Sequence, residues 1–385
     1  MSTARKATIV GLHLTKQART LPGRGSQDLA LEAVKGALDD AGLTARDVDG
    51  VALDWMSPQG SPMDACANWA PYFRQPLAWV NSDPFDRAGA RAVAKAAAAI
   101  EFGLCDVAVI GSGRAGPWSA DGSQVGATLD LEFTDPFGGS AMTHFALVMR
   151  RYMHDHGVSA DKLAAVAATI RNHGHANPEA VMFGAGPYTA QDVLASPPIA
   201  LPLHRLECCI VNEGGCALVM TTAERARDLR RKPVHVLAGG QEVMRGHYVI
   251  PPTEPESRLG ASLFPRVFGR AGIRPDDIDY WSIYDAVAFE VVRQFETIGL
   301  CKPGEGADFC AGGRLDRDGA TPTNLDGGLL SFSWIGSGQL TNKVIDATRQ
   351  LRGECGDRQV RDAALALVTN AGSGAHHMEA VVLGA

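Results

Sequence analysis

The feature that most constrains the fold of this chain is an internal repeat. Residues 41–51 read AGLTARDVDGV, and residues 271–281 read AGIRPDDIDYW. In both copies a predicted helix ends at Ala-Gly, a turn follows, and an Asp-Val/Ile-Asp run enters a predicted strand. Glycine suits the left-handed cap of a helix, and the apolar residue after it can close that cap against the helix. A pattern repeated about half a chain apart predicts two duplicated halves rather than a solenoid.

A second pair of similar segments follows the first. Residues 92–113 predict a helix and a strand that ends in VAVIGSG, and residues 340–374 run in the same way from LTNKVIDATRQLRG to ALALVTNAGSG. Alternating helices and β-rich strands predict an α/β fold with mostly parallel sheets covered by helices. The region between the copies is rich in loops and helices. We therefore expect an N-terminal half over 1–240, with a loop domain inserted at about 114–235, and a C-terminal half over 241–385.

The composition limits the class of partner. Of 385 residues, 45% are hydrophobic and 21% are charged, which is ordinary for a globular protein with a sizeable core. The formal charge of −7 argues against nucleic acid or an anionic membrane as the main partner. The apolar run at the N-terminus is too short for a signal peptide, and no stretch approaches the length of a membrane span. We expect a cytoplasmic protein that binds neither membranes nor nucleic acid.

The eight cysteines do not form a disulfide framework. Cys208 and Cys209 are adjacent, and the other cysteines are scattered without CxxC spacing. Buried free thiols in a reducing compartment are the expected state in a chain of this size. We predict no metal site, because the spacing typical of a structural zinc site is missing.

One glycine pattern resembles a dinucleotide-binding fingerprint but does not fit it. Gly111, Gly113 and Gly116 follow a predicted strand at GxGxxG spacing. The fingerprint requires a helix to begin there, and Pro117 with the Trp-Ser pair after it would interrupt one. We interpret these glycines as part of a loop over an active site.

Six longer segments carry a family resemblance. They read FALVMRRYMHDHGVSADKLAAVA (145–167), RNHGHANPEA (171–180), DVLASPPIALPLHRLECCIVNEGGCALVM (192–220), IYDAVAFEVVRQFETIGLCKPGEG (283–306), NLDGGLLSF (324–332) and RQLRGECG (349–356). These segments resemble the thiolase superfamily, and within it the sterol-carrier-protein-x type, whose members are often labelled lipid-transfer proteins. The resemblance spans nearly the whole chain. It implies an α/β fold of the duplicated thiolase type, with five layers in the order αβαβα, and a homodimer.

Each catalytic position of a thiolase can be located by its local motif, and each holds a different residue in this chain. The resemblance places Asp86 where a thiolase has its nucleophilic cysteine, Trp334 where it has a basic histidine, and Asn370 where it has a second cysteine. The His-Asp-Cys-Phe motif of the sterol-carrier type begins instead with Tyr284 and Asp285. An aspartate cannot carry a useful thioester intermediate, and a tryptophan cannot take a proton from a thiol. We therefore exclude Claisen condensation and thiolysis.

The chain is similar to a branch of the superfamily that lacks the cysteine, the steroid side-chain aldolases. These enzymes cleave a β-hydroxyacyl-CoA by a retro-aldol reaction and use a pair of tyrosines. Tyr284 matches the first tyrosine, and Trp334 takes the position of the second, after the Gly327-Gly328 pair. The reaction needs a base for the β-hydroxyl, stabilisation of a thioester enolate and an acid for the α-carbon, but no covalent intermediate.

The resemblance therefore implies a carbon–carbon lyase. Its substrate would be a bulky β-hydroxyacyl-CoA of the steroid or bile-acid side-chain type, and its products a ketone or aldehyde and a short acyl-CoA. No cofactor is expected apart from the coenzyme A that forms part of the substrate.

Four residues are the candidate catalytic groups. Tyr284 would transfer a proton at the hydroxyl or at the α-carbon, and the alternative is a buried tyrosine that anchors the loop through its hydroxyl. Asp86 lies at a predicted helix N-terminus, where it is either a general base or a plain helix cap. Asn370 would donate to the thioester oxygen, or it is only a turn residue at the end of a strand. Trp334 would shape an apolar wall for the acyl group.

Further residues are predicted to contact the substrate. Asp285 adjoins the candidate tyrosine, and Gly328 and Gly372 belong to glycine-rich turns. His376 is one of two adjacent histidines that enter the last predicted strand, where alternation lets only one of them face the site. His173 could approach the pantetheine arm. For each histidine the alternative is a purely structural role.

Two other functions remain open at this stage. The missing second tyrosine also suits a non-catalytic subunit that binds acyl-CoA or scaffolds a partner. The third alternative is an acyltransferase with a displaced nucleophile, for which Cys66 is the nearest upstream cysteine. Members of the resembled family commonly act with a small OB-fold and zinc-ribbon protein, so the resemblance implies such a partner and a heterotetramer.

Overall fold

Strands from both halves of the chain join in one mixed sheet. The structure is a computed structural model that describes residues 5–54, 65–81, 88–116, 140–243, 259–372 and 377–385, with only the backbone for 65–68. Within these ranges the order of the nine strands is β3-β2-β4-β7-β1-β8-β11-β10-β9. Their bounds are Ala7–Leu14 (β1), Gly50–Leu53 (β2), Trp79–Val80 (β3), Val107–Arg114 (β4), Gly214–Thr222 (β7), Val234–Val243 (β8), Tyr280–Ser282 (β9), Leu365–Gly372 (β10) and His377–Gly384 (β11). The two halves of the sheet join where Thr8 and Ile9 of β1 pair with β8.

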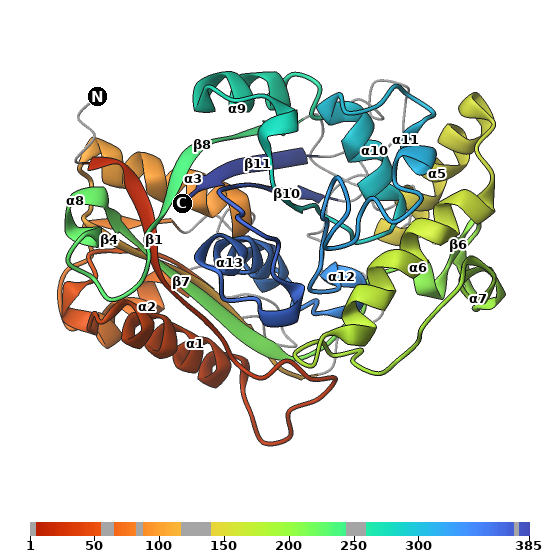
Figure 1. Cartoon of the computed structure of the whole chain (residues 1–385). Helices are drawn as coiled ribbons and strands as arrows, with labels where there is room; N and C mark the ends of the chain where they lie inside the picture. The colour runs from red at the N-terminus through yellow and green to blue at the C-terminus, as the bar shows by residue number, and fades with distance from the viewer. Residues whose placement is uncertain (1–4, 55–64, 82–87, 117–139, 244–258, 373–376) are drawn as a thin grey trace, which may run out of the picture.

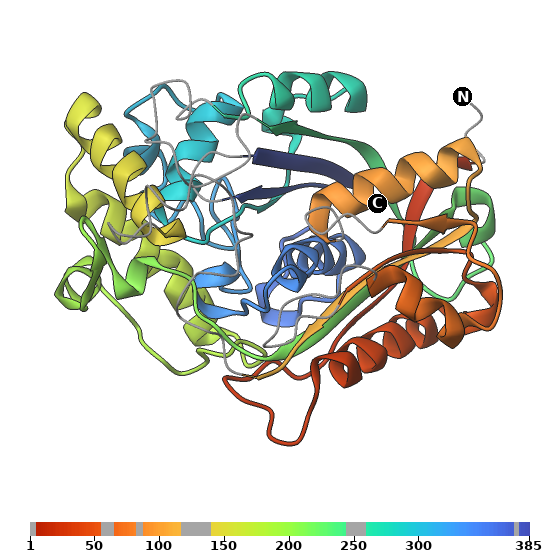
Figure 2. The ribbon, with the colours of Figure 1, turned by 180° about the vertical axis from the view of Figure 1, so that it is seen from behind.

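Helices fill the space between the two halves of the sheet and cover both outer faces. Figure 1 shows α3 and α13 between the two sheet layers, α1 and α2 beneath the layer that contains β7, and α9 above the layer that contains β8 and β11, and Figure 2 shows the same order from behind. The bounds are Ser26–Ala41 (α1), Ala65–Phe73 (α2), Gly89–Phe102 (α3), Leu263–Ala271 (α9), Phe289–Ile298 (α10) and Gly338–Arg352 (α13). This αβαβα arrangement confirms the fold class.

The first pair of repeated segments forms the same local structure twice. Helix α1 ends at Gly42 and helix α9 ends at Gly272, and both glycines have left-handed backbone angles, with φ of 74° and 70°. A short 3₁₀ turn follows each cap, Ala45–Asp47 after the first and Pro275–Asp277 after the second, and a strand follows each turn. The duplication predicted from the sequence is therefore present in the fold.

The second pair forms the two helices that lie between the sheet layers. Helices α3 and α13 both end at a left-handed glycine, Gly103 and Gly353, and each precedes a long strand, β4 or β10. Helix α3 buries alanines at Ala90, Ala92, Ala96, Ala97 and Ala99. Side chains this small let a helix approach two sheets closely, which explains the alanine-rich run in the sequence.

The prediction of mostly parallel strands was wrong. Five neighbouring pairs in the sheet are antiparallel, and only β3–β2, β2–β4 and β10–β9 are parallel. Strands β10 and β11 are separated by four residues in the chain, and so short a connection allows only an antiparallel pair. Helices cover both faces of the layers, so the strands are apolar on both faces whichever way they run.

The inserted region is shorter than predicted. It contains helices and a small hairpin with bounds Ala141–His156 (α5), Ala160–Ala176 (α6), Ala190–Ala195 (α7), Pro198–Ala200 (β5), Leu203–His204 (β6) and the 3₁₀ turn Arg205–Glu207 (η4). The predicted end of the loop domain at 235 is too late, because β7 at 214–222 lies in the main sheet between β4 and β1. The remaining short elements are Ala223–Ala226 (α8), Gly306–Phe309 (α11), Gly328–Ser331 (α12) and Gly356–Arg358 (η7).

The glycines of the GxGxxG pattern serve packing rather than a loop. Gly111 and Gly113 lie inside strand β4, which is fully buried. A Cβ on Gly113 would overlap the backbone of Ser26 and Ala30 in α1, so glycine lets this helix lie directly on the strand. Our interpretation of both residues as a loop over the active site was therefore wrong.

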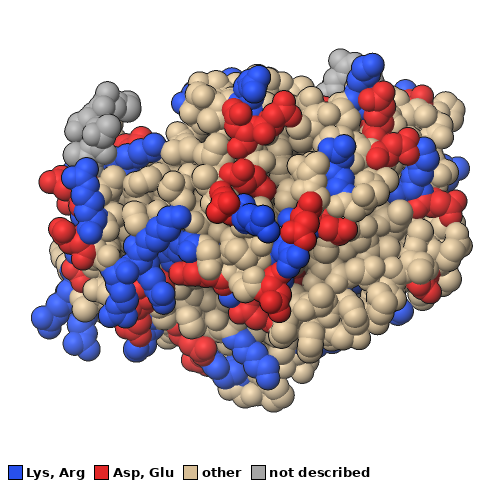
Figure 3. Space-filling view, in the orientation of Figure 1, with Lys and Arg blue, Asp and Glu red and all other residues tan. Residues whose placement is uncertain are grey.

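The surface carries charges of both signs. Figure 3 shows Lys and Arg side chains interspersed with Asp and Glu on the face of Figure 1. Among the residues that the structure describes, none of the helices combines the length and the apolar character needed to cross a membrane.

Candidate active site

The first turns of the two central helices meet beside the ends of several strands. The backbone N–H of Gly89, at the start of α3, donates to the hydroxyl of Thr341 in the first turn of α13 at 3.0 Å. The hydroxyl of Ser337, just before α13, donates to the carboxylate of Asp54, just after β2, at 3.2 Å. Two helix N-termini in one place favour negative charge, such as the oxygen of an enolate.

Tyr284 lies on a loop that directly follows strand β9. Its side chain is 5% exposed and belongs to the large hydrophobic cluster of the C-terminal half. Its backbone N–H donates to the hydroxyl of Thr369 at 2.9 Å, and its carbonyl accepts from Nε2 of Gln294 at 2.8 Å. The backbone of the candidate tyrosine is thus fixed at both its donor and its acceptor.

Asn370 adjoins this loop from the next strand, β10, and caps helix α3. Its Oδ1 accepts from the backbone N–H of Ala90 at 2.6 Å, and its Nδ2 donates to the carbonyl of Thr369 at 2.8 Å. The residue is fully buried, and a Cβ on Gly89 would overlap its Oδ1. Within the described residues the second Nδ2 hydrogen has no acceptor, so it is the group that a thioester oxygen could use. That role stays a prediction.

Trp334 lies on the loop between α12 and α13, and a single residue, Asn212, holds its backbone. Asn212 accepts from the Trp334 N–H at 2.5 Å through Oδ1, and its own N–H donates to the Trp334 carbonyl at 3.2 Å. The Trp334 side chain is half-buried and packs against the cluster that contains Tyr284 and Leu329. The structure therefore brings Trp334 and Tyr284 to the same apolar region, which suits the predicted wall.

Asp285 lies beneath the loop of Tyr284 and is bonded to the protein itself. It is fully buried, and its carboxylate forms an ion pair with Lys343 at 2.8 Å and accepts from the backbone N–H of Leu329. Gly328 has a φ of +58°, and a Cβ there would overlap the Asp285 carboxylate. Asp285 and Gly328 thus fix the turn next to Tyr284, and their predicted contact with a substrate stays a prediction.

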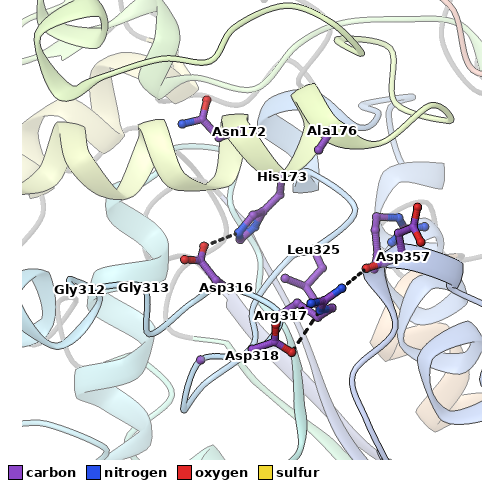
Figure 4. Close-up of a pocket in the computed structure, with 12 residues that line it drawn as sticks. Asn172, His173, Ala176, Gly312, Gly313, Asp316, Arg317, Asp318, Leu325 and Asp357 are labelled. Atoms are coloured by element: carbon purple, nitrogen blue, oxygen red, sulfur yellow. Dashed lines mark hydrogen bonds and ion pairs between the residues drawn. The ribbon is translucent and has the colours of Figure 1, made fainter.

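His173 lies on helix α6 in a separate pocket of about 540 Å³. Figure 4 shows its ring pointing at Asp316, with Nε2 3.0 Å from the carboxylate, while Arg317 in the same pocket reaches Asp318. The hydrogen bond from His173 holds the pKa of Asp316 below its usual value. His173 Nδ1 also lies 3.3 Å from the carbonyl of Asn324. Both ring nitrogens are thus engaged with the protein, and the predicted contact with a pantetheine arm stays a prediction.

Two candidate residues, Asp86 and His376, lie outside the described residues. Gly372 is the last residue of β10 and pairs with His377, the first residue of β11. His377 contacts a buried carboxylate: its Nδ1 lies 2.5 Å from Oε1 of Glu379, which also forms an ion pair with Arg91 of α3. Burial alone would raise the pKa of Glu379, but His377 and Arg91 outweigh it and hold that pKa below its usual value.

Sequence reasoning missed the residues that hold the candidate groups in place. Gln294 had a detectable signal, because it lies with Val291, Phe295 and Ile298 on the apolar face of a helix, where an uncharged polar side chain needs a partner. Asn212 had no comparable signal. Its partner Trp334 is far away in the sequence, and nothing local indicates the contact.

Comparison with known proteins places the chain in a family. Residues 264–385 match the family model described as thiolase C-terminal domain-like. A steroid side-chain-cleaving aldolase from Thermomonospora curvata is 32% identical over 96% of this chain and 95% of its own length. The chain belongs to the thiolase superfamily. This thiolase-superfamily chain is also 32% identical to a 17-hydroxy-3-oxo-4-pregnene-20-carboxyl-CoA lyase from Mycobacterium tuberculosis, over 90% of this chain and 92% of the lyase.

A solved structure is similar to the chain over its whole length. The Ltp2-ChsH2(DUF35) aldolase superimposes on this thiolase-superfamily member with a TM-score of 0.85 at 30% identity, covering 100% of this chain and 99% of that one. The resemblance to the steroid side-chain aldolases, inferred from the sequence, is thereby confirmed.

The cysteines of this thiolase-superfamily member are poor nucleophiles. Burial raises the pKa of every cysteine whose side chain the structure describes, to about 12 for Cys105, Cys208, Cys216 and Cys301. The cysteines with described side chains are Cys105, Cys208, Cys209, Cys216, Cys301, Cys310 and Cys355. Because the thiolate is the reactive form, none of these seven suits a displaced acyltransferase nucleophile. The side chain of Cys66, named above for that role, lies outside the described part of the chain.

Proposed function

We propose that this protein is a carbon–carbon lyase that cleaves a bulky β-hydroxyacyl-CoA of the steroid side-chain type by a retro-aldol reaction. The observation that carries the proposal is the backbone of Tyr284, held at both ends by buried side chains in a protein whose described cysteines have raised pKa values. The relatives named as an aldolase and as a CoA lyase support the same reaction class.

In this reaction the protein only transfers protons and forms no covalent bond to the substrate. A base takes the proton of the β-hydroxyl, the electron pair of the O–H bond forms the new carbonyl, and the bond between the α- and β-carbons breaks. The electrons of that bond pass to the thioester and form an enolate, which then takes a proton at the α-carbon. In our proposal Tyr284 moves one of these protons, and Asp86 either moves the other or caps helix α3.

The enolate oxygen is the charge that the site has to stabilise. The second Nδ2 hydrogen of Asn370, which has no acceptor among the described residues, and the N-termini of α3 and α13 supply hydrogen-bond donors and positive partial charge. Trp334 lines the side of the acyl group. No cofactor is needed beyond the coenzyme A of the substrate.

The experiment uses 17-hydroxy-3-oxo-4-pregnene-20-carboxyl-CoA, the compound that names one relative. The purified protein, alone and with a co-expressed partner, is expected to release a steroid ketone and a short acyl-CoA, followed by mass spectrometry. Intact-protein mass spectra are expected to lack an acyl adduct. Turnover that depends on an acylated cysteine would contradict the proposal and favour the acyltransferase.

A non-catalytic acyl-CoA-binding subunit is the second candidate, and Trp334 in the place of the second tyrosine favours it. This candidate predicts tight binding of the same thioester without turnover, whether or not a partner is present. Isothermal titration with the thioester, run beside the product assay, separates the two candidates.

We propose that the protein forms a homodimer through the edge of its sheet. Within the described residues β3 pairs on one side only, with β2, and an edge strand can pair with the same strand of a second copy. Beside it lies a groove of about 580 Å³ lined by Trp79, Val80, Phe102 and Leu104. Phe102 is 83% exposed and Leu104 is 48% exposed, an arrangement that a second copy would cover.

Phe102→Glu is expected to convert the dimer into a monomer. The substitution places a charge at the centre of the proposed apolar contact, where it would lose its water on association. Size-exclusion chromatography with light scattering gives the mass of each variant. Phe183→Glu is the matched control, because Phe183 is 56% exposed and lies in the inserted region. A Phe102→Glu protein with the mass of a dimer would contradict this interface.

We also propose the small OB-fold and zinc-ribbon partner that the family resemblance implies, in a heterotetramer of two copies of each chain. The similar solved structure is that of an aldolase named together with a DUF35 protein, which supports such a partner. The unbridged cysteines favour a reducing compartment, so we place the activity in the cytoplasm.

A further inference from the structure

The backbone of Tyr284 is part of a closed ring of hydrogen bonds. Its N–H donates to Thr369 Oγ1 at 2.9 Å, the Thr369 hydroxyl donates to Gln294 Oε1 at 2.5 Å, and Gln294 Nε2 donates back to the Tyr284 carbonyl at 2.8 Å. Thr369 and Gln294 are both fully buried. Each of the two side chains uses a donor and an acceptor in the ring, so neither can be replaced by an apolar residue without breaking it.

The ring lies where two neighbouring strands separate. Strand β9 pairs with β10 through Ser282 and Val368, and the backbone ladder stops there. The next residue, Ile283, has its N–H and carbonyl bonded by the side chain of Asn324, at 2.8 Å each. At Tyr284 the side chains of Thr369 and Gln294 bond the backbone N–H and carbonyl in the same way. Side chains therefore replace the missing strand partner and hold the backbone in a position that a regular sheet would not give it.

The ring also connects Tyr284 to the cap of helix α3. Thr369 precedes Asn370 in strand β10, and Asn370 accepts from the N–H of Ala90 in the first turn of that helix. One short stretch of β10 thus fixes the loop of the candidate proton-transfer group and the carboxamide that faces the helix. A shift of the loop would change the distance between these two groups.

We propose that Thr369 and Gln294 are positioning residues for Tyr284, a role that rests on the proposed retro-aldol function. Neither residue touches the reacting atoms. They act by holding the tyrosine backbone, and a misplacement of about 1 Å at a reacting group can cost about 100-fold in rate. The effect is therefore expected on kcat rather than on KM.

The decisive variant is Thr369→Val, which keeps the shape of the side chain and removes its hydroxyl. We expect kcat to fall by about 10- to 100-fold while KM stays within about threefold. Thr369→Ser keeps the hydroxyl and is expected to stay within about threefold of wild-type kcat. Thr348→Val is the matched control, because Thr348 is also fully buried and, among the described residues, its hydroxyl bonds only to the Val344 carbonyl within α13.

A double-mutant cycle with Tyr284→Phe tests whether the effect passes through the tyrosine. If it does, adding Thr369→Val to Tyr284→Phe lowers kcat no further, because the positioned group is already gone. Equal losses in Thr369→Val and Thr348→Val, or an additive loss in the double variant, would overturn the positioning role. Full activity of Tyr284→Phe would overturn the proposed function itself, and loss in Tyr284→Phe with none in Thr369→Val would overturn the ring alone.

Discussion

Tyr284→Phe is expected to lower kcat for retro-aldol cleavage by about 10²- to 10⁴-fold, the usual contribution of a positioned general acid or base. The substitution removes one oxygen and leaves the ring of hydrogen bonds around the backbone intact, since that ring uses only the main chain of Tyr284. The variant is therefore expected to fold and to bind acyl-CoA as the parent does. Steady-state kinetics with the steroid thioester and circular dichroism measure the two properties.

The matched control for this experiment is Tyr152→Phe. Tyr152 is 4% exposed, lies in the same hydrophobic cluster and donates its hydroxyl to Glu296 at 2.5 Å, far from the proposed chemistry. Its removal is expected to lower stability and to leave kcat of the folded protein within about threefold, because no reacting group changes. If Tyr284→Phe kept the kcat of the Tyr152→Phe protein, Tyr284 would have only the anchoring role considered from the sequence.

The duplicated halves could be predicted because their signals are local. Gly42 and Gly272 each cap a helix, and a glycine with an apolar residue after it identifies such a cap without any knowledge of the rest of the chain. Strand direction could not be predicted in this way. The central strands are buried on both faces, so β7 and β4 have the same apolar pattern although they run in opposite directions.

The candidate site was predictable where a motif fixes a residue at the end of a strand. Tyr284 follows β9 and Asn370 lies near the end of β10, and parallel neighbours bring such ends together. Asp285 was assigned to the substrate because an aspartate beside a catalytic tyrosine suggests binding. Asp285 forms a buried ion pair with Lys343, which is far from it in the sequence. No local sequence pattern predicts an ion pair of that kind. The sequence likewise did not show that Thr369 and Gln294 bond the backbone of Tyr284, because no local pattern indicates these contacts.

The second large effect is expected for stability, from Arg171 in helix α6. This side chain is 2% exposed, and its guanidinium donates to four backbone carbonyls in two separate segments. The carbonyls belong to Arg205, Leu206, Cys208 and Leu330. Burial lowers the pKa of Arg171 to about 10, so it keeps its charge at neutral pH. One residue therefore joins helix α6 to residues 205–208 of the inserted region and to α12.

Arg171→Met is expected to lower the free energy of unfolding by about 3–5 kcal/mol, because it removes two buried and two partly buried charge-assisted hydrogen bonds to backbone carbonyls. Guanidinium titration monitored by circular dichroism measures the change. Arg151→Met is the control: Arg151 pairs with Asp155 one turn along α5 with its side chain 58% exposed, and such an exposed pair contributes little to stability. Equal midpoints for the two variants would show that the carbonyls find other donors.

Arg171→Met also tests whether Arg171 contributes to catalysis or only to stability. Arg171 holds Leu330 at the end of α12, and the loop that carries Trp334 starts there. Asn212 still binds both backbone groups of Trp334 when Arg171 is gone, so the tryptophan keeps its own support. We therefore expect kcat of the folded fraction to change by less than about tenfold, well below the loss in Tyr284→Phe. A larger loss would mean that the packing of α6 against α12, rather than Asn212, positions the wall of the acyl site.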